Sequence, residues 1–318
     1  MAGEASANKP GLVLALGGGG ARGLAHIGVL QALAEYAVPV RAVVGTSIGA
    51  EIGAFYASGM SPDEIDDLAT AFDWKQTLQL FMPDLATGGL VSGRKIMDFL
   101  QTRLGPYRIE KLSMGYAAVA TDLETGEAVV LQSGPLVDAV RASISLPGLI
   151  APHRIGNRYL LDGSVLNPLP FDVARSLFGG PVLAVAVHAG AYPSARAARS
   201  SQWPERVQQL LRQPWTKRAE GLRAWLEAQL IQYRERNDGP AWTARRVLDQ
   251  ALDLTQAEVV RLRAAASPPD LLLVPEVGRI GPLEFYRADE AIAAGYEAMT
   301  ARLDELKKLT VTGRRIAR

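Results

Sequence analysis

The segment Gly45-Thr46-Ser47-Ile48-Gly49 constrains the fold of this chain more than any other stretch. An apolar run leads into this segment, and a helical pattern begins immediately after it. Glycines beside a serine at a strand-to-helix junction allow a sharp turn, because a Cβ on either neighbour would clash. Such a turn presents the Ser47 hydroxyl beside the amino end of a helix, where free N–H groups favour developing negative charge. The segment predicts either a nucleophile elbow or an ordinary glycine-rich turn.

The apolar pattern of the chain predicts alternating strands and helices. Continuous apolar runs typical of strands buried on both faces occupy residues 11–16 and 181–187. Other extended segments are expected at 116–120, 128–131, 158–161 and 271–274, and helices at 49–58, from 61, and at 92–104, 138–143 and 287–308. This order predicts an α/β fold of three layers, with a mostly parallel central sheet covered by helices on both faces.

Composition excludes several classes of function. The chain has 318 residues and no cysteine, which rules out thiol catalysis, disulfides and cysteine-bound zinc. Its three histidines show no metal-binding spacing, so we expect no metal and no cofactor, and a net charge of +1 argues against nucleic-acid binding. No stretch approaches the roughly 18–20 apolar residues of a spanning helix, and the first ten residues lack a signal-peptide core. We therefore expect a cytoplasmic protein, soluble or peripheral at a membrane.

The glycine-rich loop Gly17–Gly23 has two interpretations. Gly18, Gly20 and Gly23 match the dinucleotide fingerprint, but the second strand ends without the carboxylate that would hold the ribose, and no P-loop lysine follows. Alternatively, the loop turns several N–H groups toward one point and forms an oxyanion hole. Consecutive strands of a parallel sheet are usually neighbours, so this loop and the Ser47 turn are expected side by side, as acyl transfer requires.

A serine nucleophile needs a base, and two candidates follow from position. His188 ends a strand and is the only histidine suited to a triad, since His26 lies in the first helix and His153 in a loop. Asp162 ends a strand before Gly163, which lets the carboxylate point into a cleft. Its own residues favour a turn-forming or helix-capping aspartate as the simpler interpretation.

At this point the chain resembles the patatin-like phospholipase family. Three blocks in the family's order carry the likeness: Gly18–Gly23 resembles its oxyanion loop, Gly45–Gly49 its nucleophile elbow, and Asp162-Gly163 its aspartate block. Residues 142–147 are similar to a further family segment, a helix end that leads to a proline. The likeness covers about residues 11–190 and weakly 270–300.

The resemblance implies a patatin-like fold and hydrolysis of lipid or lysolipid esters without calcium. It implies a Ser–Asp dyad in which Ser47 is the nucleophile and Asp162 the base, and backbone N–H groups of Gly18, Gly19 and Gly20 that hold the oxyanion. Ser164 stands where the family more often has glycine or alanine. Arg22, beside the loop, would either bind a phosphate head group or, as we favour, pair with a carboxylate and hold the loop's shape. Soluble short-chain esters are the alternative substrates, and a nucleotide-binding protein or adaptor is the alternative class.

We expect one hydrolase domain over residues 11–318, with a helical insertion rich in Trp and Arg at about 191–266. Within it, residues 196–246 carry 11 Arg and Lys against 5 Asp and Glu, together with four of the five tryptophans. An apolar stripe on one helix is formed by Leu222, Trp225, Leu226, Leu230 and Tyr233. Such a basic amphipathic helix is typical of a membrane interface. Packing on the domain or on a second subunit of a homo-oligomer is the alternative and the commoner outcome.

Overall fold

A computed structural model describes residues 10–71, 89–187 and 244–316. The chain divides into two compact units, one of residues 1–191 and 254–318 and the other of residues 192–253. Both the Ser47 turn and Asp162 belong to the first unit, which is described below. Residues 196–243 of the proposed membrane-contact segment, including all four of its tryptophans, lie outside the described residues.

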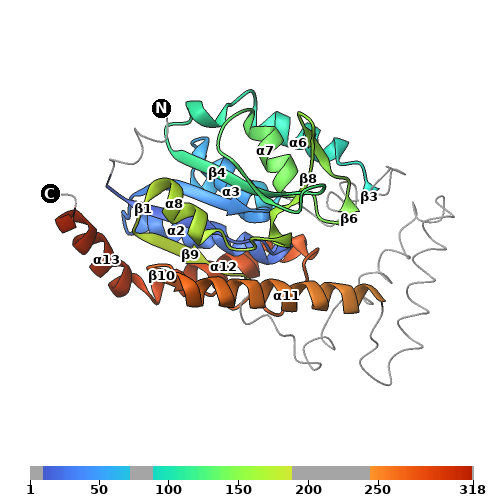
Figure 1. The fold of residues 1–318 in the computed structure, drawn as a ribbon. Helices are drawn as coiled ribbons and strands as arrows, with labels where there is room; N and C mark the ends of the chain where they lie inside the picture. The colour runs from blue at the N-terminus through green and yellow to red at the C-terminus, as the bar shows by residue number, and fades with distance from the viewer. Residues whose placement is uncertain (1–9, 72–88, 188–243, 317–318) are drawn as a thin grey trace, which may run out of the picture. The chain divides into compact units, whose positions relative to one another are not determined.

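An eight-stranded sheet forms the centre of the first unit (Figure 1). Its order is β10-β9-β1-β2-β4-β8-β7, and β5 also pairs with β4. The pairs from β10 to β4 are parallel, whereas β5, β7 and β8 add antiparallel pairs at one side. The strands are β1 Leu12–Leu16, β2 Val40–Thr46, β4 Gly115–Asp122, β5 Ala128–Leu131, β7 His153–Ile155, β8 Arg158–Asp162, β9 Val182–Val185 and β10 Leu271–Leu273. A separate two-stranded sheet pairs β3 (Gly89–Val91) with β6 (Gly148–Ile150).

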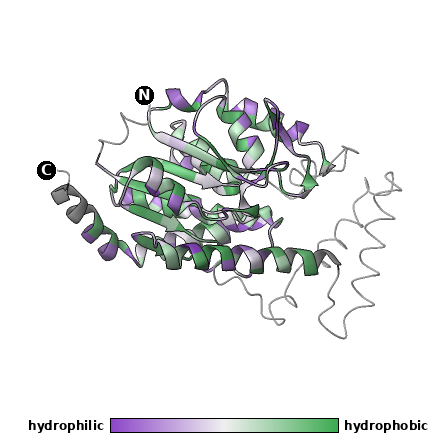
Figure 2. Ribbon diagram, in the orientation of Figure 1, coloured by the Kyte–Doolittle hydropathy of each residue, from purple (hydrophilic) through white to green (hydrophobic). Residues whose placement is uncertain are grey.

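Helices cover both faces of the sheet, which confirms the predicted α/β class. Alternate residues of β1 divide between two cores: Leu14 packs in a cluster with α2, α3 and α12, whereas Val13 packs with α8 and α11. All five residues of β1 are apolar and buried, because helices cover the strand on both faces (Figure 2). The α-helices are α2 Ala25–Glu35, α3 Ile48–Ala57, α4 Pro62–Thr70, α6 Arg94–Leu104, α7 Leu136–Ser143, α8 Phe171–Phe178, α11 Ala244–Ala266, α12 Ala288–Thr300 and α13 Leu303–Ile316; 3₁₀ turns include η1 Gly20–Leu24, η2 Ile109–Lys111, η3 Gly163–Val165 and η6 Phe285–Arg287.

Some details differ from the sequence prediction. The helix expected over 287–308 is broken into α12 and α13, because the Arg302 N–H donates to the Met299 carbonyl in a tighter turn between them. The helix α8 and the strands β3, β6 and β7 were not predicted; the three strands have three residues each and lack the continuous apolar run that marks β10. These differences do not move the elements that carry Ser47 or Asp162.

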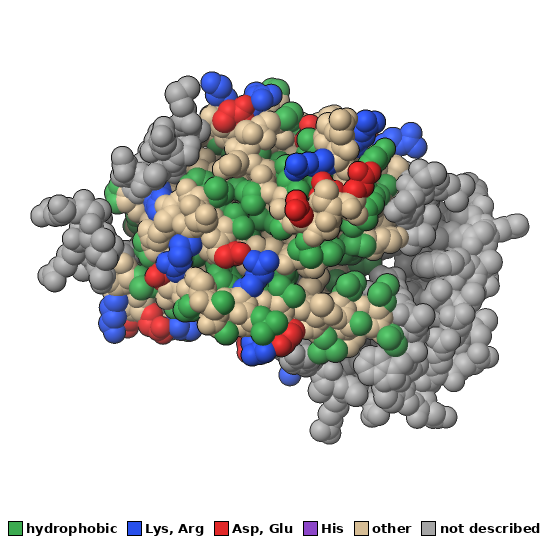
Figure 3. Space-filling model, in the orientation of Figure 1, with side chains coloured by type: hydrophobic (Ala, Val, Ile, Leu, Met, Phe, Trp, Pro, Cys, Tyr) green, Lys and Arg blue, Asp and Glu red, His purple; other side chains and the backbone are tan. Residues whose placement is uncertain are grey.

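The described residues contain no helix long and apolar enough to cross a membrane. Apolar side chains are exposed along α11, where Leu254 and Leu262 are 44% and 54% accessible (Figure 3). The opposite side of this helix packs against the sheet through Val260, which is 6% accessible.

Candidate active site

Ser47 lies on a strained turn between β2 and α3. Its φ of 55° and ψ of −127° are rarely adopted by a residue with a side chain. The turn requires its glycines, because a Cβ on Gly45 would lie 2.4 Å from the Ala50 nitrogen and one on Gly49 would lie 2.3 Å from the Leu16 carbonyl oxygen. Ser47 is therefore the N-cap residue of α3 on a sharp strand-to-helix turn, the backbone geometry of a nucleophile elbow.

The Ser47 hydroxyl donates to the Asp162 carboxylate. Its Oγ lies 2.5 Å from Asp162 Oδ2, although the two residues are 115 positions apart in sequence. The other oxygen, Oδ1, accepts the Ser164 N–H at 2.7 Å and so caps the 3₁₀ turn η3. One carboxylate oxygen of Asp162 therefore caps a turn, as its neighbouring residues favoured, while the other accepts the Ser47 hydroxyl.

Burial changes the acidity of Asp162. The side chain is 1% accessible, and burial raises its pKa from 3.8 to about 6 against the opposing effect of hydrogen bonds from Ser47 and Ser164. A charged carboxylate in a dry site is costly, so its proton affinity rises. A pKa near 6 suits a base that must be ionised at neutral pH and still bind a proton readily.

The C-terminal end of α7 and the residues just after it position both Ser47 and Asp162. Ser143 Oγ accepts the Ser47 N–H at 2.9 Å and donates to the Val119 carbonyl at 2.6 Å. Two residues later, the Ser145 carbonyl accepts the Asp162 N–H at 2.9 Å. The sequence singled out residues 142–147 only by resemblance and did not identify Ser143 as a contact of Ser47. No local pattern could have done so, because 96 residues separate the two.

The glycine loop lies beside the elbow, as expected from the pairing of β1 with β2. A Cβ on Gly18 would lie 3.2 Å from the Ser47 Cβ and 2.2 Å from Ser164 Oγ, so only glycine fits there. The Gly18 N–H donates to the Pro168 carbonyl at 3.0 Å. Among the residues that the structure describes, the N–H groups of Gly19 and Gly20 have no hydrogen-bond acceptor. Gly18 thus lies against Ser47 and anchors the loop through Pro168.

His26 supports this loop through a hydrogen bond to its first residue, Gly17. Its Nε2 lies 2.8 Å from the Gly17 carbonyl oxygen, and the ring is fully buried. Burial lowers the pKa of His26 to about 4, so the ring is neutral at pH 7 and Nε2 carries the proton that it donates. His26 therefore packs in the core, as expected. His153 contacts Asp138 at 3.1 Å, and His188 lies outside the described residues.

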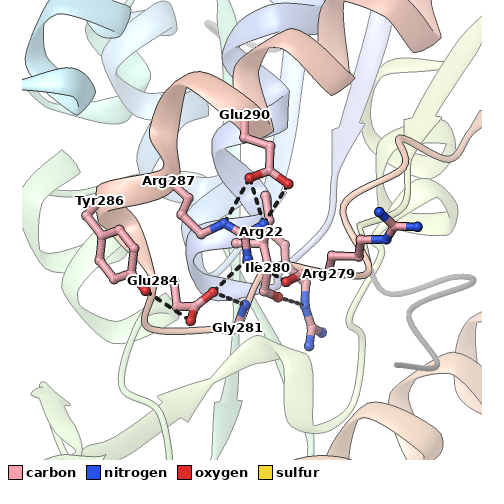
Figure 4. Close-up of polar contacts among 8 residues, drawn as sticks. All are labelled: Arg22, Arg279, Ile280, Gly281, Glu284, Tyr286, Arg287 and Glu290. Atoms are coloured by element: carbon pink, nitrogen blue, oxygen red, sulfur yellow. Dashed lines mark hydrogen bonds and ion pairs between the residues drawn. The ribbon is translucent and has the colours of Figure 1, made fainter. Parts of the chain in front are cut away.

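Arg22 is buried beneath the loop. The side chain is 4% accessible, and its Nε donates to the Ile280 carbonyl at 2.8 Å (Figure 4). This contact agrees with a role for Arg22 in holding the loop's shape, here through a main-chain carbonyl. No group of three or more potential metal ligands occurs within the described ranges.

Comparison with known proteins shows the family to which the chain belongs. A family model described as patatin-like phospholipase matches residues 14–175. An uncharacterised NTE family protein of Mycobacterium tuberculosis is 34% identical over 333 residues, which cover 93% of this chain and 92% of the relative. The patatin-like phospholipase domain-containing protein 7 of Rattus norvegicus is 37% identical over 186 residues, 55% of this chain and 13% of that protein.

Among solved structures, VipD from Legionella pneumophila is similar with a TM-score of 0.48 and 16% identity, covering 93% of this chain and 67% of that one. The family match and the mycobacterial relative show that the chain belongs to the patatin-like phospholipase family. The resemblance inferred from the three motif blocks is confirmed. Membership of this family supports lipid hydrolysis as the class of activity.

Proposed function

We propose that this protein is a serine acyl hydrolase that cleaves carboxylic esters of lipids or lysolipids through a Ser47–Asp162 dyad. The observation that carries the proposal is the 2.5 Å hydrogen bond from Ser47 Oγ to Asp162 Oδ2 on a strained elbow. A hydroxyl bonded to a buried carboxylate is an activated nucleophile. No histidine contacts either residue within the described ranges.

In the first half of the reaction, Ser47 Oγ attacks the ester carbonyl carbon while its proton passes to Asp162 Oδ2. Negative charge develops on the carbonyl oxygen, and the N–H groups of Gly19 and Gly20 are the proposed donors to it. Gly18 was expected as a third donor, but its N–H is directed to Pro168 and fixes the loop instead. Asp162 then returns the proton to the leaving alcohol, which leaves an acyl group on Ser47.

In the second half, water replaces the alcohol. Asp162 takes a proton from the attacking water, the oxyanion forms again at the same donors, and the acid product leaves as Ser47 regains its proton. The Ser143 hydroxyl keeps the Ser47 main chain in place throughout, because it bonds the Ser47 N–H rather than the reacting oxygen. All steps use groups of this chain and water.

The test is ester hydrolysis with matched serine variants. Purified protein is assayed with phosphatidylcholine, lysophosphatidylcholine and p-nitrophenyl butyrate, beside Ser47→Ala and Asp162→Asn. We expect each variant to lose 10³-fold or more, as groups that act as a unit do. The control is Ser58→Ala, since Ser58 caps the other end of α3 and its hydroxyl donates to the Phe55 carbonyl, far from the reacting groups. Labelling by a fluorophosphonate that persists in Ser47→Ala would refute the assignment of the nucleophile.

The variant His188→Ala separates dyad from triad and is expected to keep a substantial fraction of activity. Loss equal to that of Ser47→Ala, with normal folding, would show that a triad operates. Hydrolysis of p-nitrophenyl butyrate alone would favour the soluble-ester alternative. Absence of both hydrolysis and labelling would favour the nucleotide-binding or adaptor alternative.

A further inference from the structure

The segment of residues 279–290, here called the C-terminal brace, packs directly on the glycine loop. The Ala21 N–H donates to the Pro282 carbonyl at 2.9 Å, and Arg22 Nε donates to the Ile280 carbonyl at 2.8 Å. A Cβ on Gly20 would lie only 2.2 Å from the Pro282 oxygen. The carbonyl groups of Ile280 and Pro282 therefore fix the positions of the three consecutive loop residues 20–22.

A single guanidinium holds the brace in its turned shape. Arg287 Nη1 donates to Glu284 Oε2 at 2.9 Å and to the Arg279 carbonyl at 2.5 Å, while Nη2 lies 2.6 Å from Glu290. The same Glu284 oxygen accepts the Gly281 N–H at 3.0 Å. Figure 4 shows these contacts converging from both ends of the turn, with Arg22 beside them.

The pair at the centre of the brace is sheltered from water. The side chains of Arg287 and Glu284 are 26% and 24% accessible, in contrast to the more exposed ion pairs on α11 and at the start of α13. Charge-assisted hydrogen bonds with several acceptors in a fixed fork hold geometry better than an exposed pair does. Removing the guanidinium leaves Glu284 with the Gly281 N–H and the Tyr286 hydroxyl, and it frees the Arg279 carbonyl.

We propose that Arg287 is a positioning residue for the oxyanion loop, acting through Glu284 and the carbonyls of Ile280 and Pro282. The inference rests on the proposed function, since it assumes that the Gly20 N–H is an oxyanion donor. A change in the Pro282 position alters the Gly20–Ala21 main chain, and donors must lie within a few tenths of an ångström of the developing oxyanion. The brace lies outside the family-model match, which ends at residue 175.

The experiment measures loop mobility and catalysis separately in Arg287→Met. Hydrogen–deuterium exchange of peptides that cover residues 17–24 reports the loop, and hydrolysis of p-nitrophenyl butyrate reports catalysis. We expect faster exchange in these peptides, a fall in kcat of about tenfold and a KM within about twofold of wild type. Arg287→Lys should recover part of kcat, because an ammonium can pair with Glu284 but lacks the planar fork.

The matched control is Arg302→Met, which removes an arginine that pairs with a glutamate three residues later on α13. It should leave loop exchange and kcat unchanged.

Glu284→Gln tests the same brace with a side chain of the same shape and should reproduce the kcat loss if Arg287→Met folds poorly. Unchanged exchange of residues 17–24 in folded variants overturns the proposal, and so does faster exchange with wild-type kcat. A wild-type protein inactive on all esters refutes the proposed function, and exchange alone then decides whether Arg287 braces the loop.

Discussion

Replacing Asp162 with Asn is expected to abolish hydrolysis and, above pH 6, to make the fold more stable. Burial raises the pKa of Asp162 from 3.8 to about 6, so the folded state binds this proton more tightly than the unfolded chain does. Such a group stabilises the fold fully below pH 3.8, and this contribution is lost as pH rises through about 6. The ionised form of Asp162 that catalysis needs is therefore the form that lowers the free energy of unfolding.

The magnitude follows from the pKa difference. A rise from 3.8 to about 6 corresponds to roughly 3 kcal/mol between a protonated and an ionised Asp162. Asn is neutral at every pH, and its Oδ1 can still accept the Ser164 N–H that Asp162 accepts now. We expect Asp162→Asn to gain about 1–3 kcal/mol in free energy of unfolding at pH 8 relative to wild type, and little or nothing at pH 4.

Urea unfolding of both proteins from pH 4 to 8 measures this difference. Other groups with changed pKa values, such as Glu51 at about 7 and His26 at about 4, contribute to both proteins and cancel. In parallel, kcat/KM of the wild type should fall about tenfold per pH unit below 6. A stability difference that does not grow between pH 4 and 7 would refute the argument that burial destabilises the ionised carboxylate.

Four further outcomes are expected. Ser164→Ala removes hydrogen bonding that lowers the pKa of Asp162, so the acid limb of kcat/KM should move to higher pH, and an unmoved limb contradicts this role. Gly28→Ala places a Cβ 1.9 Å from a main-chain oxygen of α12 and should cost about 2 kcal/mol or more, measured by thermal unfolding. EDTA should leave hydrolysis unchanged, and activity restored by a divalent cation after EDTA would oppose this. If the basic segment 196–246 contacts a membrane, the protein should co-sediment with anionic vesicles, and this binding should weaken with salt and with Trp225→Ala; binding insensitive to both indicates a packing role.

Local features of the site follow from the sequence alone. The elbow at Ser47 requires a sharp turn between a strand and a helix, and the glycines that permit it are adjacent in the chain. The parallel pairing of β1 and β2 follows from two apolar runs in succession, and it brings the glycine loop beside the elbow. Periodicity and turn chemistry act over a few residues, which is why these elements were predictable.

Only the tertiary structure decides which groups meet at the hydroxyl. Ser47 and Asp162 are 115 residues apart, and the residues of Asp162 alone favoured a capping role. The use of the Gly18 N–H by Pro168 and the support of Ser47 by Ser143 are likewise long-range contacts. The raised pKa of Asp162 has the same origin, because burial is a property of the packed core that surrounds a residue and not of its neighbours in sequence.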